Sequence, residues 1–142
     1  MTDTSAAANK ELIREFYKEV FGDWNMTLVD KVVSPEFISH DWPEGGPTGP
    51  QAFRDFYAMI RSVAPDARYE VDDLIAEGNK VAVRWRMLGT HRGRFRGIEP
   101  TGRAVVLRGI AIYRVEDGKL RERWVVSDLQ GVLEQIQQAP SK

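Results

Sequence analysis

Apolar residues recur at helical spacing twice near the start of the chain. The first run covers residues 12–21 and stops at Gly22, so we expect a helix there. The second run covers residues 26–33, with Asn25 as a cap and Pro35 as a stop, and it predicts a shorter helix. Each helix has one apolar face, which must pack against another element of the fold.

Residues 37–50 are crowded with Pro and Gly and are predicted to form a loop. This loop still carries two groups of chemical interest, the titratable His40 and the bulky Trp42. A third helix is expected directly after it, because aromatic and aliphatic side chains follow one stripe until Pro65 ends the pattern. Phe56 belongs to this stripe.

Beyond Pro65 the hydrophobic period changes from helical to two, which is typical of strands. Four strands are expected, at residues 68–77, 80–91, 103–115 and 119–128. Turns that contain Gly join the first strand to the second and the third to the fourth, so these pairs should be antiparallel hairpins. Helices followed by an antiparallel sheet predict an α+β fold with the helices packed on one sheet face.

The chain has 142 residues, which fits a single domain. We expect residues 9–138 to form this domain, with a closing helix over 129–137 and polar tails at 1–8 and 139–142. The N-terminus shows no targeting pattern, and no apolar run is long enough to cross a membrane. These patterns are typical of a soluble cytoplasmic protein.

Twenty Lys and Arg residues against 21 Asp and Glu residues give a net charge of -1. Such a chain has no overall field to attract nucleic acid or an anionic membrane, so we expect neither as a partner. The chain has no Cys, which excludes disulfides and thiolate chemistry. Its two His residues do not stand at a metal-binding spacing, and we expect no metal.

Alternation along the strands divides the predicted sheet into two faces. One face is apolar and aromatic and should carry the core. Its members include Trp85, Met87, Gly109, Ala111 and Tyr113 on the two central strands, and Leu120, Glu122, Trp124, Val126 and Asp128 on the last strand. The opposite face mixes Arg with aliphatic side chains, which suits solvent or a homodimer contact through the sheet.

Asp128 is the first candidate for chemistry, because the predicted phase aims its carboxylate toward the apolar interior beside Trp124 and Val126. Burial raises the pKa of a carboxyl group, and a raised pKa suits proton transfer near neutral pH. An equally good interpretation is that Asp128 caps the closing helix, since Asp is a preferred N-cap residue. The residues alone leave both roles open.

His91 is expected to end the second strand in phase with Trp85 and Met87. A neutral imidazole there could orient a carboxylate or a substrate oxygen, although a hydrogen-bonded structural histidine is the commoner case. His40 could stand at a pocket mouth or could be a solvated loop residue.

Gly109 and Ala111 indicate an internal cavity, because they place small side chains in the middle of the third strand, where a filled core would need large ones. Trp42, Trp85 and Trp124 could line such a cavity, but aromatic stripes more often form plain core. A pocket for a drug-sized ligand should measure about 300 Å³ or more.

Five motifs follow one another along the chain: NKELIREFYKEVF, FISHDWP, GPQAFRDFYAMIRSVAPDARYEVDDLIAEGNKVAVRW, GTHRGRFRGIEPTGR and IAIYRVEDGKLRERWVVSD, so that the similarity covers roughly residues 9–137. Together they resemble the SnoaL-like polyketide cyclase, or ester cyclase, family of the nuclear-transport-factor-2-like (NTF2-like) superfamily. The resemblance implies an NTF2-like (cystatin-like) open cone, in which N-terminal helices pack on a strongly curved antiparallel sheet of about four long strands. It also implies a protein that is usually dimeric and a pocket that works without a metal or an organic cofactor.

In the cyclases of this family, an aspartate on the last strand acts as acid and base for an intramolecular aldol closure of a polyketide ester. The matching position here is Asp128, while His40 and His91 match polar positions near the pocket. The chain departs from the family pattern at Arg123, where many members have His, and its third strand has no inward His.

We therefore expect a cofactor-free enzyme that acts on an apolar carbonyl compound, with Asp128 as the acid/base and His91 as a donor to the developing enolate. The expected pocket residues are His40, Trp42, Phe56, Trp85, Met87, Phe95, Tyr113 and Trp124. The alternatives are a non-catalytic module that binds a small molecule, and an isomerase or hydrolase that uses the same pocket.

Overall fold

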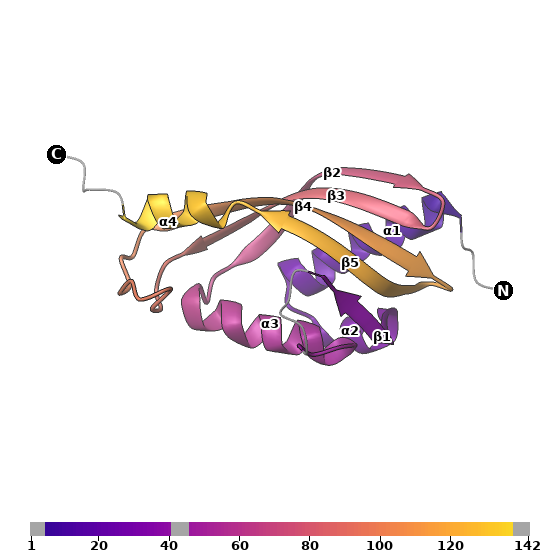
Figure 1. Ribbon diagram of the computed structural model, residues 1–142, viewed down its shortest axis with the longest axis horizontal. Helices are drawn as coiled ribbons and strands as arrows, with labels where there is room; N and C mark the ends of the chain where they lie inside the picture. Colours follow the sequence, from indigo (N-terminus) through magenta and orange to yellow (C-terminus); the bar gives the residue numbers. More distant parts are fainter. Residues whose placement is uncertain (1–4, 41–45, 138–142) are drawn as a thin grey trace.

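The computed structural model describes residues 5–40 and 46–137. Within these ranges, four α-helices and one π-helical turn combine with a five-stranded sheet (Figure 1). The helices are α1 (Ala6–Phe16), the π-helical turn η1 (Tyr17–Gly22), α2 (Met26–Val32), α3 (Pro50–Val63) and α4 (Leu129–Gln137). The strands are β1 (Val33–Ser39), β2 (Arg68–Glu77), β3 (Lys80–Thr90), β4 (Ala104–Glu116) and β5 (Lys119–Ser127).

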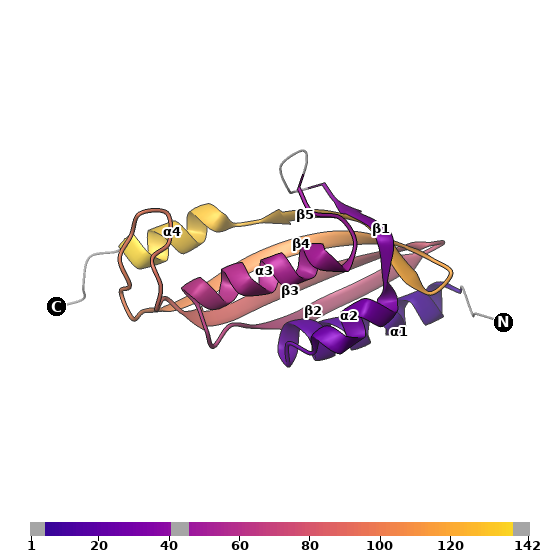
Figure 2. The same cartoon turned by 90° about the horizontal axis from the view of Figure 1, so that it is seen from below.

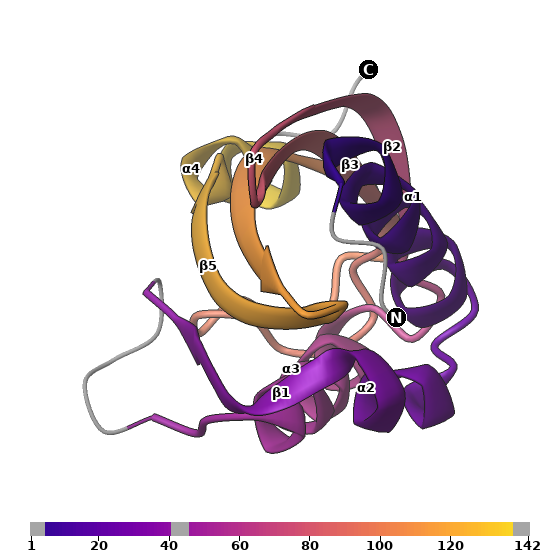
Figure 3. The ribbon, with the colours of Figure 1, turned by 90° about the vertical axis from the view of Figure 1, so that its right-hand side faces the viewer.

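The sheet has the strand order β1-β5-β4-β3-β2, and its four long strands are antiparallel neighbours. It curls strongly, with α1, α2 and α3 on one side (Figures 2 and 3). The α+β class and the curved, unclosed sheet expected from the sequence are confirmed. α4 docks on β4, because the Gln135 side chain bonds both the N–H and the C=O of Val106.

The predicted hairpins are formed by two-residue turns. Glu116 pairs with Lys119, and the two residues between them, Asp117 and Gly118, have φ values of 52° and 74°. Positive φ at both central positions is the conformation that closes a twisted hairpin, and Asp-Gly is among the sequences that adopt it most readily. The second hairpin turns at Gly78, which also has positive φ.

The N-terminal helix begins earlier than the sequence predicts. Residues 6–8 belong to α1 and not to a tail, because the Ser5 hydroxyl caps the helix by accepting the N–H of Ala8 at 3.1 Å. The expected cap of α2 is confirmed, since the Asn25 side chain accepts the N–H of Thr27. Residues 1–4, and the expected tail at 139–142, lie outside the described residues.

The fifth strand, β1, was not predicted. The sequence pattern predicted that a helix ends and a loop begins within these residues, but they form a strand that pairs in parallel with β5. Pro35 lies within this strand, which its position at the edge of the sheet allows, because an edge strand need not donate every N–H. β1 matters for the site because it places Ser39 beside Arg123.

The concave face of β3 and β4 carries the core, as the alternation predicted. Val81, Val83, Trp85 and Met87 on β3 are buried in the hydrophobic core, where the Trp85 ring contacts the ring of Tyr69 on β2. On β4 the inward residues are Val105, Leu107, Ala111 and Tyr113. Inward-facing residues of both strands were therefore correctly identified from the period of two.

On β5 the predicted phase is wrong beyond Leu120. Val115 pairs with Leu120, but the next pair is Arg114 with Glu122, so Arg121 is an extra residue in a β-bulge. A single extra residue exchanges the two faces of everything that follows. Leu120 is buried as expected, whereas the later members of the predicted inward set face outward: Glu122, Trp124, Val126 and Asp128.

The convex face of the sheet exposes several large apolar side chains. Cross-strand pairs place Ile110 opposite Val126 and Ile112 opposite Trp124. Ile75 continues the patch through Ala82, which is paired with both Ile75 and Ile112. Val126 is the most exposed of them, at 79%. Within the described ranges, no helix is both long enough and apolar enough to cross a membrane.

Candidate functional site

An internal cavity of about 220 Å³ lies between the concave face of the sheet, α3 and α4. Its walls are almost entirely apolar, with Phe56, Met59 and Val63 from α3 and Val132 and Ile136 from α4. Among the described residues of the lining, only Met59 is exposed, so we place the mouth of the cavity beside it. The volume is smaller than the 300 Å³ expected from the sequence, so a drug-sized ligand would project through the mouth.

Gly109 has a different role from the one inferred from the sequence. A Cβ at this position would overlap the indole ring of Trp85, which packs over the glycine. The small residue therefore makes room for an indole and does not itself create the empty space. Leu107 and Val105, further along β4, line the cavity together with Trp85 itself.

Trp85 lines the cavity and carries a buried indole N–H. The residue is 4% exposed, and its ring contacts Tyr69 at a centroid distance of 4.9 Å. In the part of the chain that the structure describes, its indole Nε1 is buried without a hydrogen-bond partner. A buried N–H without an acceptor lowers the stability of the fold by about 1–3 kcal/mol. A ligand that supplied an acceptor would recover this free energy.

His91 supplies a second donor, and its tautomer is fixed by its neighbours. The backbone N–H of Thr101 donates to His91 Nδ1 at 3.2 Å, and the Thr101 hydroxyl lies 3.0 Å from the same atom. Because Nδ1 accepts, the hydrogen of the neutral ring resides on Nε2. The ring is 1% exposed and lines the cavity, and Nε2 has no partner among residues 5–40 and 46–137.

Arg123 and Tyr17 also line the cavity, and neither was predicted. Arg123 is 6% exposed, its Nε donates to Ser39 Oγ at 2.9 Å, and its guanidinium lies over the rings of Phe53 and Tyr113. The β5 bulge turns Arg123 inward. If the bulge could be recognised in the sequence, the alternation along β5 would predict Arg123 to face the interior. Tyr17 had no signal beyond its place on the apolar stripe of the first helix.

Asp128 does not line the cavity, contrary to the predicted direction of its side chain. It is exposed, and its Oδ1 accepts the N–H of Gly131 at 2.9 Å in the first turn of α4. This is the N-cap geometry that the sequence left open as the alternative. Its neighbours in the chain, Ser127 and Leu129, do line the cavity, so the backbone of Asp128 lies at the cavity rim. A catalytic role for Asp128 stays a prediction.

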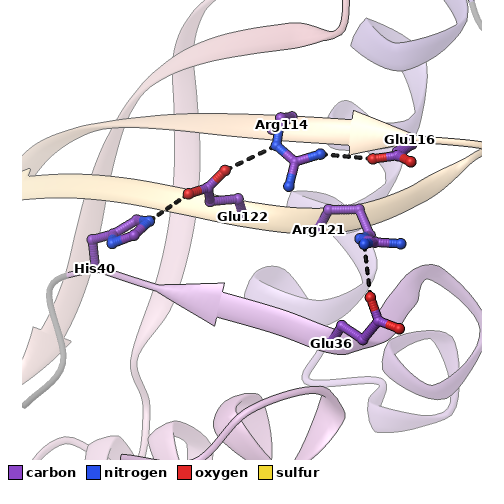
Figure 4. Close-up of polar contacts among 6 residues, drawn as sticks. All are labelled: Glu36, His40, Arg114, Glu116, Arg121 and Glu122. Carbon is purple, nitrogen blue, oxygen red and sulfur yellow. Dashed lines mark hydrogen bonds and ion pairs between the residues drawn. The ribbon is translucent and has the colours of Figure 1, made fainter. Parts of the chain in front are cut away.

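His40 and Trp124 lie on the convex side of the sheet and not in the pocket. Their rings stack at 5.1 Å, and His40 Nε2 lies 2.6 Å from a carboxylate oxygen of Glu122 (Figure 4). Arg114 bonds the other oxygen of Glu122 at 2.8 Å, and these contacts hold the pKa of the Glu122 carboxyl below its usual range. The bulge is again the reason, because it turns Glu122 and Trp124 outward.

Five of the predicted site residues meet in the cavity. Those that meet are Phe56, Trp85, Met87, His91 and Phe95. Tyr113 is fully buried but lies behind the lining, bonded to Tyr17. Trp42 falls outside the described residues. In the described ranges, no group of three or more His, Asp or Glu side chains is placed to hold a metal ion.

Comparisons with known proteins agree with this architecture. The sequence profile of the family described as SnoaL-like polyketide cyclase matches residues 11–136. Nogalonic acid methyl ester cyclase of Streptomyces nogalater is 31% identical over 110 residues, covering 76% of this chain and 82% of the relative.

Solved structures show the same fold over nearly the whole chain. IdmH of Streptomyces antibioticus, assigned as a polyketide cyclase, is 26% identical with a TM-score of 0.80, and the match covers 91% of this chain and 98% of the IdmH chain. AclR of Streptomyces galilaeus, assigned as a hydroxylase, is 27% identical with a TM-score of 0.79, and the match covers 96% of this chain and 89% of the AclR chain. With the family profile spanning most of the sequence, the chain belongs to the SnoaL-like polyketide cyclase family.

Proposed function

We propose that this protein is a cofactor-free cyclase that closes a ring within an apolar carbonyl compound held in the internal cavity. One observation carries the proposal: Trp85 and His91 belong to the lining of an apolar cavity, and their buried Nε1 and Nε2 atoms have no hydrogen-bond partner within the described part of the chain. Donors preorganised in a dry site stabilise an oxygen on which negative charge develops.

The reaction needs one proton acceptor and two carbonyl groups in one molecule. A base takes the proton from the carbon next to the first carbonyl, which becomes an enolate. The enolate carbon then forms a bond to the carbon of the second carbonyl, whose oxygen takes up a proton. The product has the same atoms as the substrate, so no oxidant or reductant is required. Trp85 and His91 would donate to the enolate oxygen.

Asp128 is retained in this proposal as the proton acceptor, at the rim of the cavity and not inside it. Two observations support this choice. Ser127 and Leu129, on either side of it in the chain, line the cavity, and no Asp or Glu of the described ranges belongs to the lining itself. To act, the carboxylate would have to turn from Gly131 toward the mouth.

The direct test is incubation of the purified protein with nogalonic acid methyl ester, the compound in the name of the relative from S. nogalater. A cyclase should convert it to an isomer of equal mass with a changed retention time and absorption spectrum. Because AclR is assigned as a hydroxylase, the same analysis should look for a product heavier by one oxygen atom. An unchanged compound that stays bound would indicate the alternative, a non-catalytic binding protein, which the exposed position of Asp128 favours.

We also propose that the protein forms a homodimer through the convex face of the sheet. The exposed patch of Ile75, Ile110, Ile112, Trp124 and Val126 is continuous across four strands. Some charged side chains around it are paired within one chain, as in the Arg86–Asp72 and Arg114–Glu122 contacts, and Lys80 lies over the Trp124 ring. A second copy that covers the patch would bury its apolar side chains beside these charges, which already have contacts in their own chain.

Val126→Asp should convert such a dimer to a monomer, because each copy would bury a carboxylate in the apolar centre of the contact. Sedimentation velocity of the wild type and the variant measures this directly. Ala58→Asp, on the exposed surface of α3, is the matched control and should leave the dimer intact. A wild-type protein that sediments as a monomer would contradict the proposed contact.

A further inference from the structure

The connection between β3 and β4, residues 91–103, crosses one end of the cavity. Just after β3, the backbone N–H groups of Arg92 and Gly93 both donate to the C=O of Val63, at 3.0 and 2.9 Å. Just before β4, the side chain of Arg103 donates to a backbone C=O of α4 at 3.1 Å. Figures 1 and 2 show this connection at the same end of the molecule as α4 and the C-terminal end of α3. The connection is therefore attached to both α3 and α4, which line the cavity.

The connection also packs closely against the backbone of α3. A Cβ at Gly93 would stand 1.6 Å from the C=O oxygen of Ser62, so only glycine fits at this position. Together with the two hydrogen bonds to Val63, this contact favours a fixed wall over a mobile flap.

A tight turn within the connection presents Phe95 to the cavity. Phe95 and Ile98 exchange both of their backbone hydrogen bonds, at 3.0 and 2.9 Å, and the two residues between them have φ values of 48° and 81°. Positive φ at both central positions is the conformation of a two-residue hairpin turn. Phe95 is half-buried, lines the cavity and packs against the core, and the Arg96 guanidinium lies 5.6 Å from the centre of its ring. The turn and these contacts hold the ring in place.

The lining differs between the two ends of the cavity. At one end, four aromatic side chains are joined by ring contacts: Phe21, Phe56, Tyr69 and Trp85. Further along β3, Gly89 pairs with Val105, which lines the cavity together with Val132 and Ile136 of α4. This second end is aliphatic. The β3–β4 connection begins directly beyond it, so Phe95 closes the aliphatic end.

We propose that Phe95 is a specificity-determining residue, which limits the length of the alkyl chain that a ligand can place in the aliphatic end of the cavity. This inference rests on the proposed function, because it describes the substrate of the same cavity. The aromatic end suits a planar ring, and the aliphatic end suits a chain. The substrate class is thereby narrowed to carbonyl compounds that carry a ring body and a short alkyl chain.

The small volume of the cavity, about 220 Å³, gives the position of this wall a large effect. Each methylene group that a ligand buries should raise its affinity about fourfold. A methylene group that meets the wall, or that leaves through the mouth beside Met59, should add nothing. The dependence of affinity on chain length therefore reports where the wall stands.

A series of ketones that differ only in chain length can test this dependence. The probes are 2-acetylnaphthalene and its homologues with butanoyl, hexanoyl and octanoyl chains. Quenching of tryptophan fluorescence gives the dissociation constant of each probe for the wild type, Phe95→Ala and Phe95→Trp. Phe56→Ala is the matched control, because Phe56 is also a half-buried phenylalanine of the lining but belongs to the aromatic end.

In the wild type, the affinity should rise with the first added methylene groups and then level off. Phe95→Ala should extend the rise by about three methylene groups, because the removed ring leaves space for them. The octanoyl compound should then bind Phe95→Ala about tenfold or more tightly than the wild type. Phe95→Trp should move the limit to shorter chains. Phe56→Ala should weaken all four probes by a similar factor without moving the limit.

The same chain-length dependence in the wild type and both Phe95 variants would overturn the role of Phe95. An equal shift of the limit in Phe56→Ala would do so too, because any enlargement of the cavity would then suffice. Both results would leave the proposed function standing, since the ketones still bind. If no probe binds the wild type, both the inference and the proposed function are wrong. Thermal unfolding checks each variant, and if Phe95→Ala does not fold, the shift in Phe95→Trp decides.

Discussion

Trp85→Phe is expected to lower turnover of the cyclisation substrate by about 100-fold, because one preorganised donor to the enolate oxygen is removed. The ring of Phe still fills most of the space above Gly109, so the fold should persist. The measurement is kcat with nogalonic acid methyl ester, together with the midpoint of thermal unfolding. The loss should appear in kcat more than in KM, since the oxygen accepts most strongly when its charge develops.

Trp24→Phe is the matched control for this variant. The Trp24 indole already donates to the carbonyl of Ala67 at 2.7 Å, so its loss should affect stability and not turnover. His91 allows a second comparison, in which His91→Leu removes the donor and His91→Gln replaces it with an amide N–H. We expect His91→Gln to retain more activity than His91→Leu. Equal turnover in Trp85→Phe and the wild type would contradict the role of the indole.

Asp128→Asn is expected to lower turnover by about 100-fold or more, because an amide cannot accept the substrate proton. The same variant should unfold at nearly the wild-type temperature, since Asn caps a helix as well as Asp does and can keep the contact with the Gly131 N–H. This combination separates the two roles that the sequence left open. The measurements are kcat and the free energy of unfolding from urea denaturation.

Asp128→Ala completes the comparison, because it removes the cap as well as the carboxylate and should cost about 1 kcal/mol of stability in addition. Glu134→Gln, which removes an exposed carboxylate from the same helix, should change neither quantity. Full turnover in the Asn variant would restrict Asp128 to capping α4. The proton would then have to go to another acceptor, and the assignment of this residue would be wrong.

Much of the fold could be predicted because helical and strand periods are local signals. The ends of α3 follow from Pro50 and Pro65, and the β4–β5 hairpin from Asp117-Gly118. His91 and Trp85 could be placed in the interior for the same reason, since β3 is regular along its pairing with β4. Each of these inferences needed only a few neighbouring residues.

The last strand shows where local reasoning stops. In the sequence, Arg121 differs in no visible way from Arg123, the other arginine of β5, yet Arg121 is the extra residue that exchanges the two faces of the strand. A bulge depends on how two strands pair, which one strand's sequence does not reveal. Asp128 and Trp124 were therefore predicted to point inward, and Arg123 was predicted to point outward.

The tyrosine pair could not be found from the sequence for a related reason. Tyr17 and Tyr113 are 96 positions apart, and only the packing of η1 against the sheet brings their hydroxyl groups together. The same holds for Ser39 and Arg123, which meet because β1 adds to the edge of the sheet. Contacts of this kind are set by the tertiary fold and not by the period of the chain.

The proposed function depends most on the buried N–H groups of Trp85 and His91, and nitrogen-15 NMR can observe them directly. Titration with 2-acetylnaphthalene should move the Trp85 indole N–H resonance downfield and saturably as it gains an acceptor. The Trp24 indole, bonded to Ala67, and the exposed Trp124 indole should stay in place. A Trp85 resonance that does not move while the probe binds would contradict the claim that this donor is available to a ligand.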